Sequence, residues 1–266
     1  MFALDKPMGP SAFQALCALR DEDPALRERK LGHTGRLDPL AEGLLAVLVD
    51  DENQRVVEHR GADKTYELGV LFGVATDSFD SLGVVTALAP AAVSERALRG
   101  VIPRWVGAVE QRCAPFSQAK VGGRSLISLG HSGEVVDRPA RPRVIASITL
   151  LGLDALSLAA VAEEAARRVD LVRGSFRQDL LRARWSALSG DPRRLTLARL
   201  SVDCSAGTFM RSLAFDLGEA LGLPALAWTI RRTRVGALTL EGARRLSRPW
   251  RPETSATPTP PARPAR

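Results

Sequence analysis

The stretch from Leu31 to Leu44 reads Leu-Gly-His-Thr-Gly-Arg-Leu-Asp-Pro-Leu-Ala-Glu-Gly-Leu and gives the first indication of the fold. Asp38 directly precedes Pro39, whose ring disfavours the α region for the preceding residue, so we expect an extended backbone with the carboxylate projecting from a loop. The glycines at 32, 35 and 43 permit tight turns and close approach of a ligand. The apolar run 44–49 predicts a buried strand behind this loop. The sequence thus predicts a carboxylate on a loop that a buried strand holds in place. An ordinary Asp-Pro turn would give the same pattern.

Length and composition favour one large domain in a reducing compartment. The chain has 266 residues, of which 45% are hydrophobic, enough to bury a full core. Its three cysteines are widely separated and form no Cys-x-x-Cys pair, so neither a metal site nor a disulfide framework is expected. We see no signal peptide at the N-terminus and no apolar run of the roughly 20 residues that span a bilayer. We therefore expect a cytoplasmic protein without membrane contact.

The charge of the chain favours a polyanionic partner. Its formal net charge is +7, and nearly all of the positive side chains are arginines. Arginine suits bidentate phosphate contacts and stacking on bases, so this composition favours binding to nucleic acid. The same arginine content is also explained by a biased genome.

Hydrophobic patterns along the chain predict alternating helices and strands without a regular βαβ period. A capping box from Ser11 to Gln14 predicts a helix that runs to about residue 20. We expect further helices at 52–59, 94–99, before 168 and after Thr208, the expected N-cap, and strands at 66–72, 84–86, 144–151 and 195–204. This order favours an α+β fold with a mixed, mostly antiparallel sheet flanked by helices.

Three segments interrupt this pattern. Residues 111–143 hold several prolines, glycines and arginines with little periodicity, which predicts a long, mobile, basic loop. Residues 251–266 are rich in proline and predict a disordered tail. The arginine-rich stretch 172–194 gives no indication of a function.

Several single residues are candidates for chemistry. Arg211 lies near the start of a predicted helix, where a cation is slightly disfavoured, so an ion pair with Asp38 would explain its position. From these residues alone, however, a solvated arginine is the more common case in an arginine-rich chain. Tyr66, the only tyrosine, stands on a predicted strand and could stack on an extruded base, although such a residue more often belongs to the core. His33 is expected to fasten its loop by a hydrogen bond, because no second histidine lies nearby. Asp77 and Asp80 are expected to be turn and cap residues.

Taken together, these segments resemble the TruB family of tRNA pseudouridine-55 synthases. The resemblance runs from the Leu-Asp-Lys-Pro-Met-Gly-Pro-Ser block at residues 4–11 to the Arg-Arg-Thr-Arg-Val-Gly block at 231–236. Between them, residues 32–43 resemble the catalytic motif of the family, 64–66 and 73–83 its next block, 114–124 and 138–142 its substrate-clamping insertion, and 203–211 its late arginine motif. The resemblance implies a pseudouridine-synthase-like catalytic domain at 1–250, with 111–143 as a mobile RNA-clamping loop.

The resemblance also implies a mechanism and its residues. Asp38 would be the essential carboxylate that helps detach uracil from ribose in uridine 55 of the tRNA T-loop, so that the base turns and rejoins through carbon 5. Arg211 would be its ion-pair partner, and Tyr66 would stack on the flipped base. The remaining substrate-binding residues would be Lys6, His33, Lys120, Arg138, Phe209 and Ile230, with the arginines at 138, 141, 143, 231, 232 and 234 holding the T-arm backbone. No cofactor and no metal are implied, and we expect a monomer.

Two departures from the family pattern leave alternatives open. Phe209 stands where the family usually has tyrosine, so a hydroxyl that could fasten the Asp38–Arg211 pair is missing. Bacterial relatives commonly continue into a small RNA-binding domain of the PUA type, which we expect to be absent here. A tRNA-binding folding chaperone with secondary or lost catalysis, or a guide-dependent synthase, remains an alternative. Whether Asp38 attacks the sugar or the base, or acts as a base, also stays open.

Overall fold

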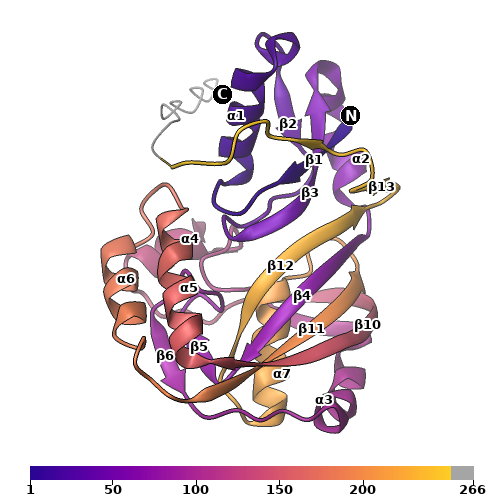
Figure 1. Cartoon of the computed structure of the whole chain (residues 1–266). Coiled ribbons are helices and arrows are strands. Elements are labelled where there is room, and N and C mark those ends of the chain that lie inside the picture. Colours follow the sequence, from indigo (N-terminus) through magenta and orange to yellow (C-terminus); the bar gives the residue numbers. More distant parts are fainter. Residues whose placement is uncertain (253–266) are drawn as a thin grey trace.

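A large mixed sheet organises the chain in the computed structural model, which describes residues 1–252 (Figure 1). Its strands follow the order β14-β1-β3-β12-β4-β11-β10-β7, with β2 beside β3 and β13 beside β12. The pairs β1–β14 and β3–β12 are parallel and the others are antiparallel, which confirms the predicted mixed, mostly antiparallel sheet. The strands are β1 (Phe2–Lys6), β2 (Leu31–His33), β3 (Ala41–Val49), β4 (Lys64–Phe72), β7 (Gly107–Arg112), β10 (Ala140–Ser157), β11 (Arg194–Cys204), β12 (Ala225–Val235), β13 (Leu238–Thr239) and β14 (Arg244–Arg245).

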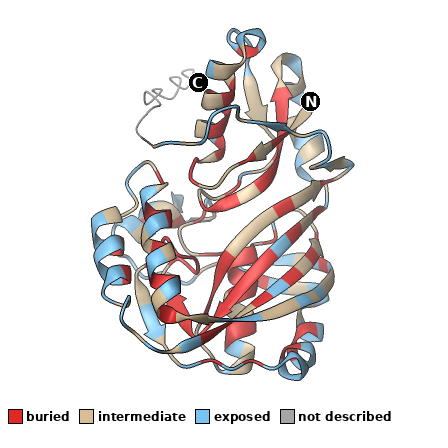
Figure 2. Cartoon of the chain, viewed as in Figure 1, coloured by how far each residue is buried: buried red, intermediate tan, exposed pale blue. Residues whose placement is uncertain are grey.

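Helices cover both faces of this sheet because its central strands are apolar on both sides. On β4, Leu68, Val70 and Phe72 pack with α7 and α3, whereas Leu71 packs on the other face with α5 and α6. The buried residues accordingly concentrate on β4, β12 and α7 (Figure 2). The helices are α1 (Ala12–Glu22), α2 (Val56–Arg60), α3 (Glu95–Val101), α4 (Leu126–His131), α5 (Leu158–Asp170), α6 (Gln178–Ser186) and α7 (Met210–Leu221). No helix within residues 1–252 is both long and apolar enough to cross a bilayer.

Short elements complete the fold. The hairpin β5 (Val74–Thr76) and β6 (Val85–Leu88) encloses the polar loop predicted at 73–83. The expected helix at 52–59 is divided into a 3₁₀ turn and α2. The 3₁₀ turns lie at Pro24–Leu26, Asp50–Arg55 and Ile102–Trp105, and β8 (Lys120–Val121) pairs with β9 (Arg124–Ser125).

The segment 111–143, predicted to be a long loop with little periodicity, contains regular elements. This segment contains the end of β7, the β8–β9 hairpin, α4 and the start of β10. Cys113, Leu126 and Leu129 form a small buried cluster against which Phe209 packs. Hydrophobic periodicity does not indicate these elements because they are short. In addition, Phe209, which is far away in the sequence, covers part of their apolar surface. Residues 253–266 of the predicted tail lie outside the described residues.

The topology of the sheet brings distant segments together at one site. Strand β12 lies between β3 and β4, and Ile230 pairs with Ala41 on one side and with Leu68 on the other. A Cβ at Gly43, where φ is +95°, would lie 2.3 Å from the backbone oxygen of Arg232, so only glycine allows β3 to lie this close to β12. The first turn of α7, which precedes β12 in the chain, lies beside the loop that carries Asp38, as the contact between Arg211 and Asp38 shows.

Candidate active site

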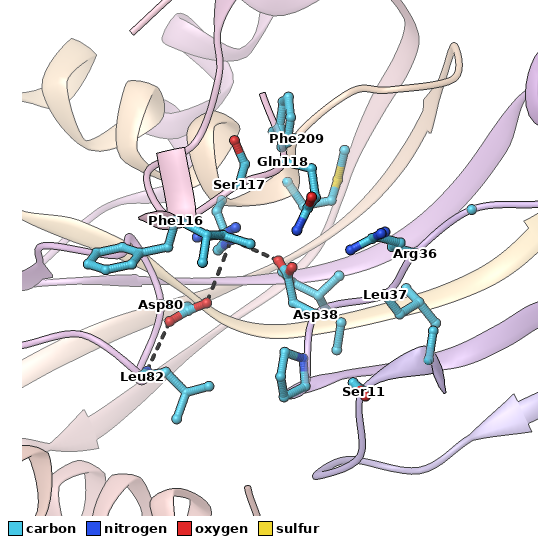
Figure 3. A pocket seen from close by; sticks show the side chains of 18 of the residues that line it. Ser11, Arg36, Leu37, Asp38, Asp80, Leu82, Phe116, Ser117, Gln118 and Phe209 are labelled. Atoms are coloured by element: carbon cyan, nitrogen blue, oxygen red, sulfur yellow. Dashed lines mark hydrogen bonds and ion pairs between the residues drawn. The ribbon is translucent and has the colours of Figure 1, made fainter. Parts of the chain in front are cut away.

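A cavity of about 930 Å³ lies where the Asp38 loop, β4, β12 and the start of α7 meet (Figure 3). Further parts of its wall come from four segments that are distant in the sequence, at 11–13, 78–82, 116–119 and 175–177. A cavity of this size accommodates a nucleotide.

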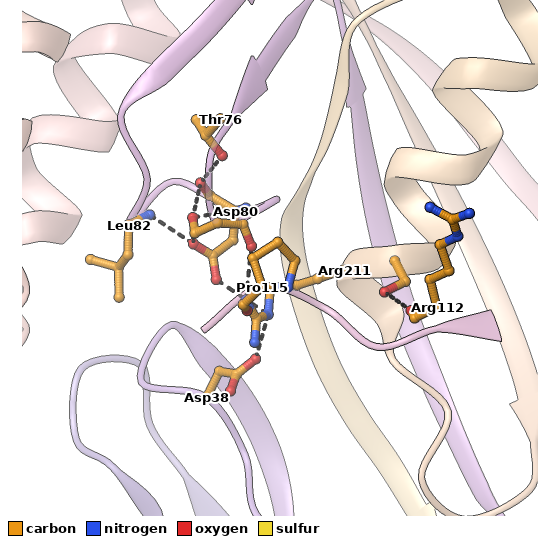
Figure 4. A network of polar contacts seen from close by, with 9 residues as sticks. Asp38, Thr76, Asp80, Leu82, Arg112, Pro115 and Arg211 are labelled. Carbon is orange, nitrogen blue, oxygen red and sulfur yellow. Dashed lines mark hydrogen bonds and ion pairs between the residues drawn. The ribbon is translucent and has the colours of Figure 1, made fainter. Parts of the chain in front are cut away.

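Asp38 and Arg211 form an ion pair in the wall of this cavity. The Nε atom of Arg211 donates to Oδ2 of Asp38 at 2.8 Å, and the Asp38 side chain is 44% exposed whereas that of Arg211 is 5% exposed. Two backbone carbonyls, those of Ser78 and Pro115, accept from Nη1 of Arg211 at 2.8 and 2.7 Å (Figure 4). Arg211 is therefore held from three sides and fixes the orientation of a carboxylate that faces the cavity.

Asp80 completes this network, and sequence reasoning missed this contribution. Its Oδ2 lies 3.6 Å from Nε of Arg211, while its Oδ1 accepts from the Ser78 hydroxyl and the Leu82 amide (Figure 4). Asp80 thus has the turn role predicted for it, but only through Oδ1, whereas Oδ2 faces Arg211. Burial raises the pKa of Asp80 and the charge of Asp38 adds to this, while Arg211 opposes it. Burial acts to lower the pKa of Arg211, but Asp38 and Asp80 together outweigh it and the pKa is raised.

Tyr66, Ile230 and His33 all line the cavity, as their predicted roles require. Tyr66 is buried on β4, and this burial raises the pKa of its hydroxyl. Burial lowers the pKa of His33 to about 4, assisted by Arg36, so this imidazole is neutral at pH 7. Its Nδ1 is buried without a hydrogen-bond partner among the described residues. This atom therefore does not make the predicted hydrogen bond that would fasten the loop.

Lys6 is buried beneath the Asp38 loop and does not line the cavity, which corrects its prediction as a substrate-binding residue. Its Nζ donates to the carbonyls of Pro7, Pro10 and Pro39 at 2.9, 2.7 and 3.2 Å. Burial lowers the pKa of Lys6 to about 7. Because Pro39 follows Asp38, Lys6 fixes the loop that presents the acid.

Arg232 also supports this loop from below. It is 2% exposed and donates to the carbonyls of Leu44, Arg36 and Gly35. Arg232 also lines the cavity, but these carbonyls engage its guanidinium inside the protein, which does not fit the predicted contact with an RNA backbone.

Two predicted substrate-binding residues of the 111–143 segment, Lys120 and Arg138, lie outside the cavity. Lys120 is exposed on β8, and Arg138 donates to the Cys113 carbonyl at 2.7 Å with its guanidinium 4.8 Å from the centre of the Phe79 ring. Neither of these basic side chains lines the wall around Asp38.

Phe209 lines the cavity and forms the N-cap of α7, so the prediction of Thr208 as the cap is wrong. The buried side chain of Gln111 accepts from the Phe209 amide at 2.8 Å and donates to its carbonyl at 3.0 Å. A glutamine of β7 thus satisfies a free amide at the start of the helix, which no local sequence pattern reveals.

Metal-ligating side chains do not gather in the part of the chain that the structure describes. No group of three or more histidine, cysteine or acidic side chains within residues 1–252 could hold a metal ion. Cys17, Cys113 and Cys204 are buried free thiols.

A comparison with models of protein families shows which family the chain belongs to. The model of the TruB family pseudouridylate synthase N-terminal domain matches residues 24–170. The chain belongs to the TruB family. This match includes Asp38, Tyr66 and Asp80 but ends before Arg211. The tertiary structure brings Arg211 from outside the matched residues into contact with Asp38.

Relatives within the TruB family extend the similarity to most of the chain. A tRNA pseudouridine synthase B of Ralstonia nicotianae is 36% identical over 240 residues, covering 90% of this chain and 64% of the relative. One of Bordetella pertussis is 35% identical over 244 residues, covering 90% of this chain and 82% of the relative. The chain thus spans less than two thirds of the Ralstonia protein. A solved structure titled as a Cbf5-Nop10-Gar1 complex shares the fold with a TM-score of 0.56 at 23% identity, over 92% of this chain and 51% of that chain.

Proposed function

We propose that this TruB-family chain is a tRNA pseudouridine synthase that isomerises uridine 55 in the T-loop. The observation that carries this proposal is the half-exposed carboxylate of Asp38, paired with buried Arg211 in a cavity of nucleotide size. The names of the relatives, tRNA pseudouridine synthase B, support the same reaction.

The reaction breaks the bond between ribose and N1 of uracil and forms a new one to C5. A proton leaves C5 and N1 gains one, so the atoms balance without a cofactor or an energy source. We assign the essential carboxylate to Asp38, its orientation to Arg211 and stacking on the extruded base to Tyr66, while Ile230 lines the pocket. Extrusion of a base that is already in a loop costs a few kcal/mol, which contacts inside such a pocket offset.

Basic side chains near the cavity support binding of an RNA backbone. Arg36 and Arg60 line the cavity, and Arg141 and Arg143 are on β10, where it pairs with the edge strand β7. Phosphate contacts from such side chains position an RNA without reading its sequence. We propose that this surface holds the T-arm, with Lys120 and Arg138 of the 111–143 segment contributing from outside the cavity.

Release of tritium from carbon 5 tests the proposal. An unmodified tRNA transcript labelled at carbon 5 of its uridines is incubated with the purified chain, with Asp38→Ala, and with Asp179→Ala as a control on an exposed carboxylate. We expect wild type and Asp179→Ala to release the label of one uridine and Asp38→Ala to release none while still binding tRNA. Tight binding by wild type without release would instead support the chaperone alternative.

A further inference from the structure

We propose that Arg177 is a positioning residue for the Asp38–Arg211 pair, acting from the connector at 171–177 between α5 and α6. The proposal rests on the proposed function and assigns a role to part of the arginine-rich stretch for which sequence analysis found none. The connector supplies Ser175, Phe176 and Arg177 to the wall of the cavity.

The connector is anchored at its beginning to α1 and to Trp250, near the end of the described residues. Nε1 of Trp250 donates to the carbonyl of Leu171 at 2.9 Å, and Nε2 of Gln14 donates to that of Arg173 at 3.4 Å. Its position beside the cavity is therefore set by packing and hydrogen bonds on more than one element.

Arg177 fastens the end of the connector to two loops of the candidate active site. Its Nη1 and Nη2 atoms donate to the two carboxylate oxygens of Asp77 at 2.7 and 3.0 Å. Its guanidinium also lies 4.9 Å from the centre of the Phe116 ring. The backbone of Arg177 has φ = 58°, a left-handed conformation that residues other than glycine rarely adopt. Such a conformation persists where surrounding contacts over-determine it, and it is concentrated at functional sites.

These two contacts lie directly beside the groups that hold Arg211. Asp77 precedes Ser78 and Phe116 follows Pro115, and the carbonyls of Ser78 and Pro115 both accept from Arg211. Figure 3 shows Phe116 near the cavity, and Figure 4 shows Pro115 beside Arg211. A single guanidinium thus ties together the two loops whose carbonyls set the position of Arg211, and through it the orientation of Asp38.

Loss of this contact should reduce the rate of the chemical step more than the affinity for tRNA. A displacement of about 1 Å at a reacting group costs roughly 100-fold in rate. Most affinity for RNA comes from phosphate contacts elsewhere on the surface. For Arg177→Gln we therefore expect a single-turnover rate constant reduced about 10- to 100-fold with tRNA binding nearly unchanged.

The test combines rate and binding measurements on four proteins and a control. Tritium release and tRNA binding are measured for wild type, Arg177→Gln, Asp77→Asn and the double variant, with Arg182→Gln on α6 as a matched surface arginine. We expect each single variant to be slow, the double variant to be no slower than the slower single one, and the control to match wild type. Arg177→Lys should recover only part of the rate, because lysine keeps the charge but lacks the planar fork. If Arg177→Gln does not fold, Arg177→Asn replaces it, since asparagine tolerates left-handed backbone.

Two results overturn the inference while leaving the proposed function intact. One is an active wild type with an equally fast Arg177→Gln, and the other is a loss of tRNA binding that accounts for the whole loss of rate. A second readout does not depend on catalysis: the unfolding equilibrium constants of Arg177→Gln, Arg211→Met and their double variant. We expect the equilibrium constant of the double variant to differ at least about 2-fold from the value that the two single variants predict if their effects are independent. Independent effects would overturn the inference, even if wild type released no tritium and the proposed function failed.

Discussion

Replacing Arg211 by methionine removes the cation from a buried cluster that holds a carboxylate on each side. The Arg211 side chain is 5% exposed, donates to Asp38 at 2.8 Å and lies 3.6 Å from Asp80. Removing one partner from a buried ion pair costs roughly 3–5 kcal/mol, because a charge is left uncompensated away from water. We expect a loss of about this size in the free energy of unfolding at pH 7.

The loss should depend on pH with a definite sign. Burial already raises the pKa of Asp80, and Arg211 opposes that rise, so without the arginine the pKa moves higher still. An acid whose folded pKa lies above its unfolded value binds more protons when folded, so stability falls as pH rises through that window. Arg211→Met should therefore be less destabilised at pH 5 than at pH 8.

Urea unfolding at pH 5 and pH 8 provides the assay, with wild type, Arg211→Met, and the double variant Arg211→Met with Asp80→Asn. The neutral amide that Asp80→Asn introduces should recover part of the stability at pH 8, since no buried charge remains on that side. Arg182→Met on the surface of α6 is the matched control and should change stability by less than about 0.5 kcal/mol. A loss below about 1 kcal/mol in Arg211→Met, or a loss independent of both pH and Asp80, would refute the reasoning.

Three further outcomes are expected at single positions. Asp38→Asn should abolish tritium release while the urea midpoint changes little, because Asp38 is half exposed; appreciable release would contradict its role. Lys6 has a folded pKa of about 7, so the unfolded chain binds more protons above pH 7 and the free energy of unfolding rises with pH. From pH 7 to 9, we expect this rise in wild type to exceed that in Lys6→Met by up to about 1.4 kcal/mol per pH unit. Urea unfolding measures both proteins, and the same pH dependence in both would contradict this. In His33, a folded pKa of about 4 means that protonation favours unfolding, so His33→Leu should move the acid-unfolding midpoint, followed by circular dichroism, to lower pH.

Much of the local structure follows from short sequence patterns. The capping box predicted at Ser11 and Gln14 is present with both of its hydrogen bonds, and the apolar run 44–49 lies within buried β3. These predictions succeed because capping and strand formation depend on residues only a few positions apart. The pairing of Asp38 with Arg211, implied by the resemblance to the TruB family, is also present.

The sequence by itself determined the fold class, the position of Asp38 on an extended loop and the membership of the TruB family. Only the tertiary structure decided that Lys6 and Arg232 support that loop from inside the protein, that Asp80 shares Arg211 with Asp38, and that Arg177 fastens two loops of the site. The physical reason is that periodicity and capping report backbone preferences over a few residues. Whether a charged side chain faces solvent, substrate or a buried carbonyl depends on which distant segments the sheet brings beside it.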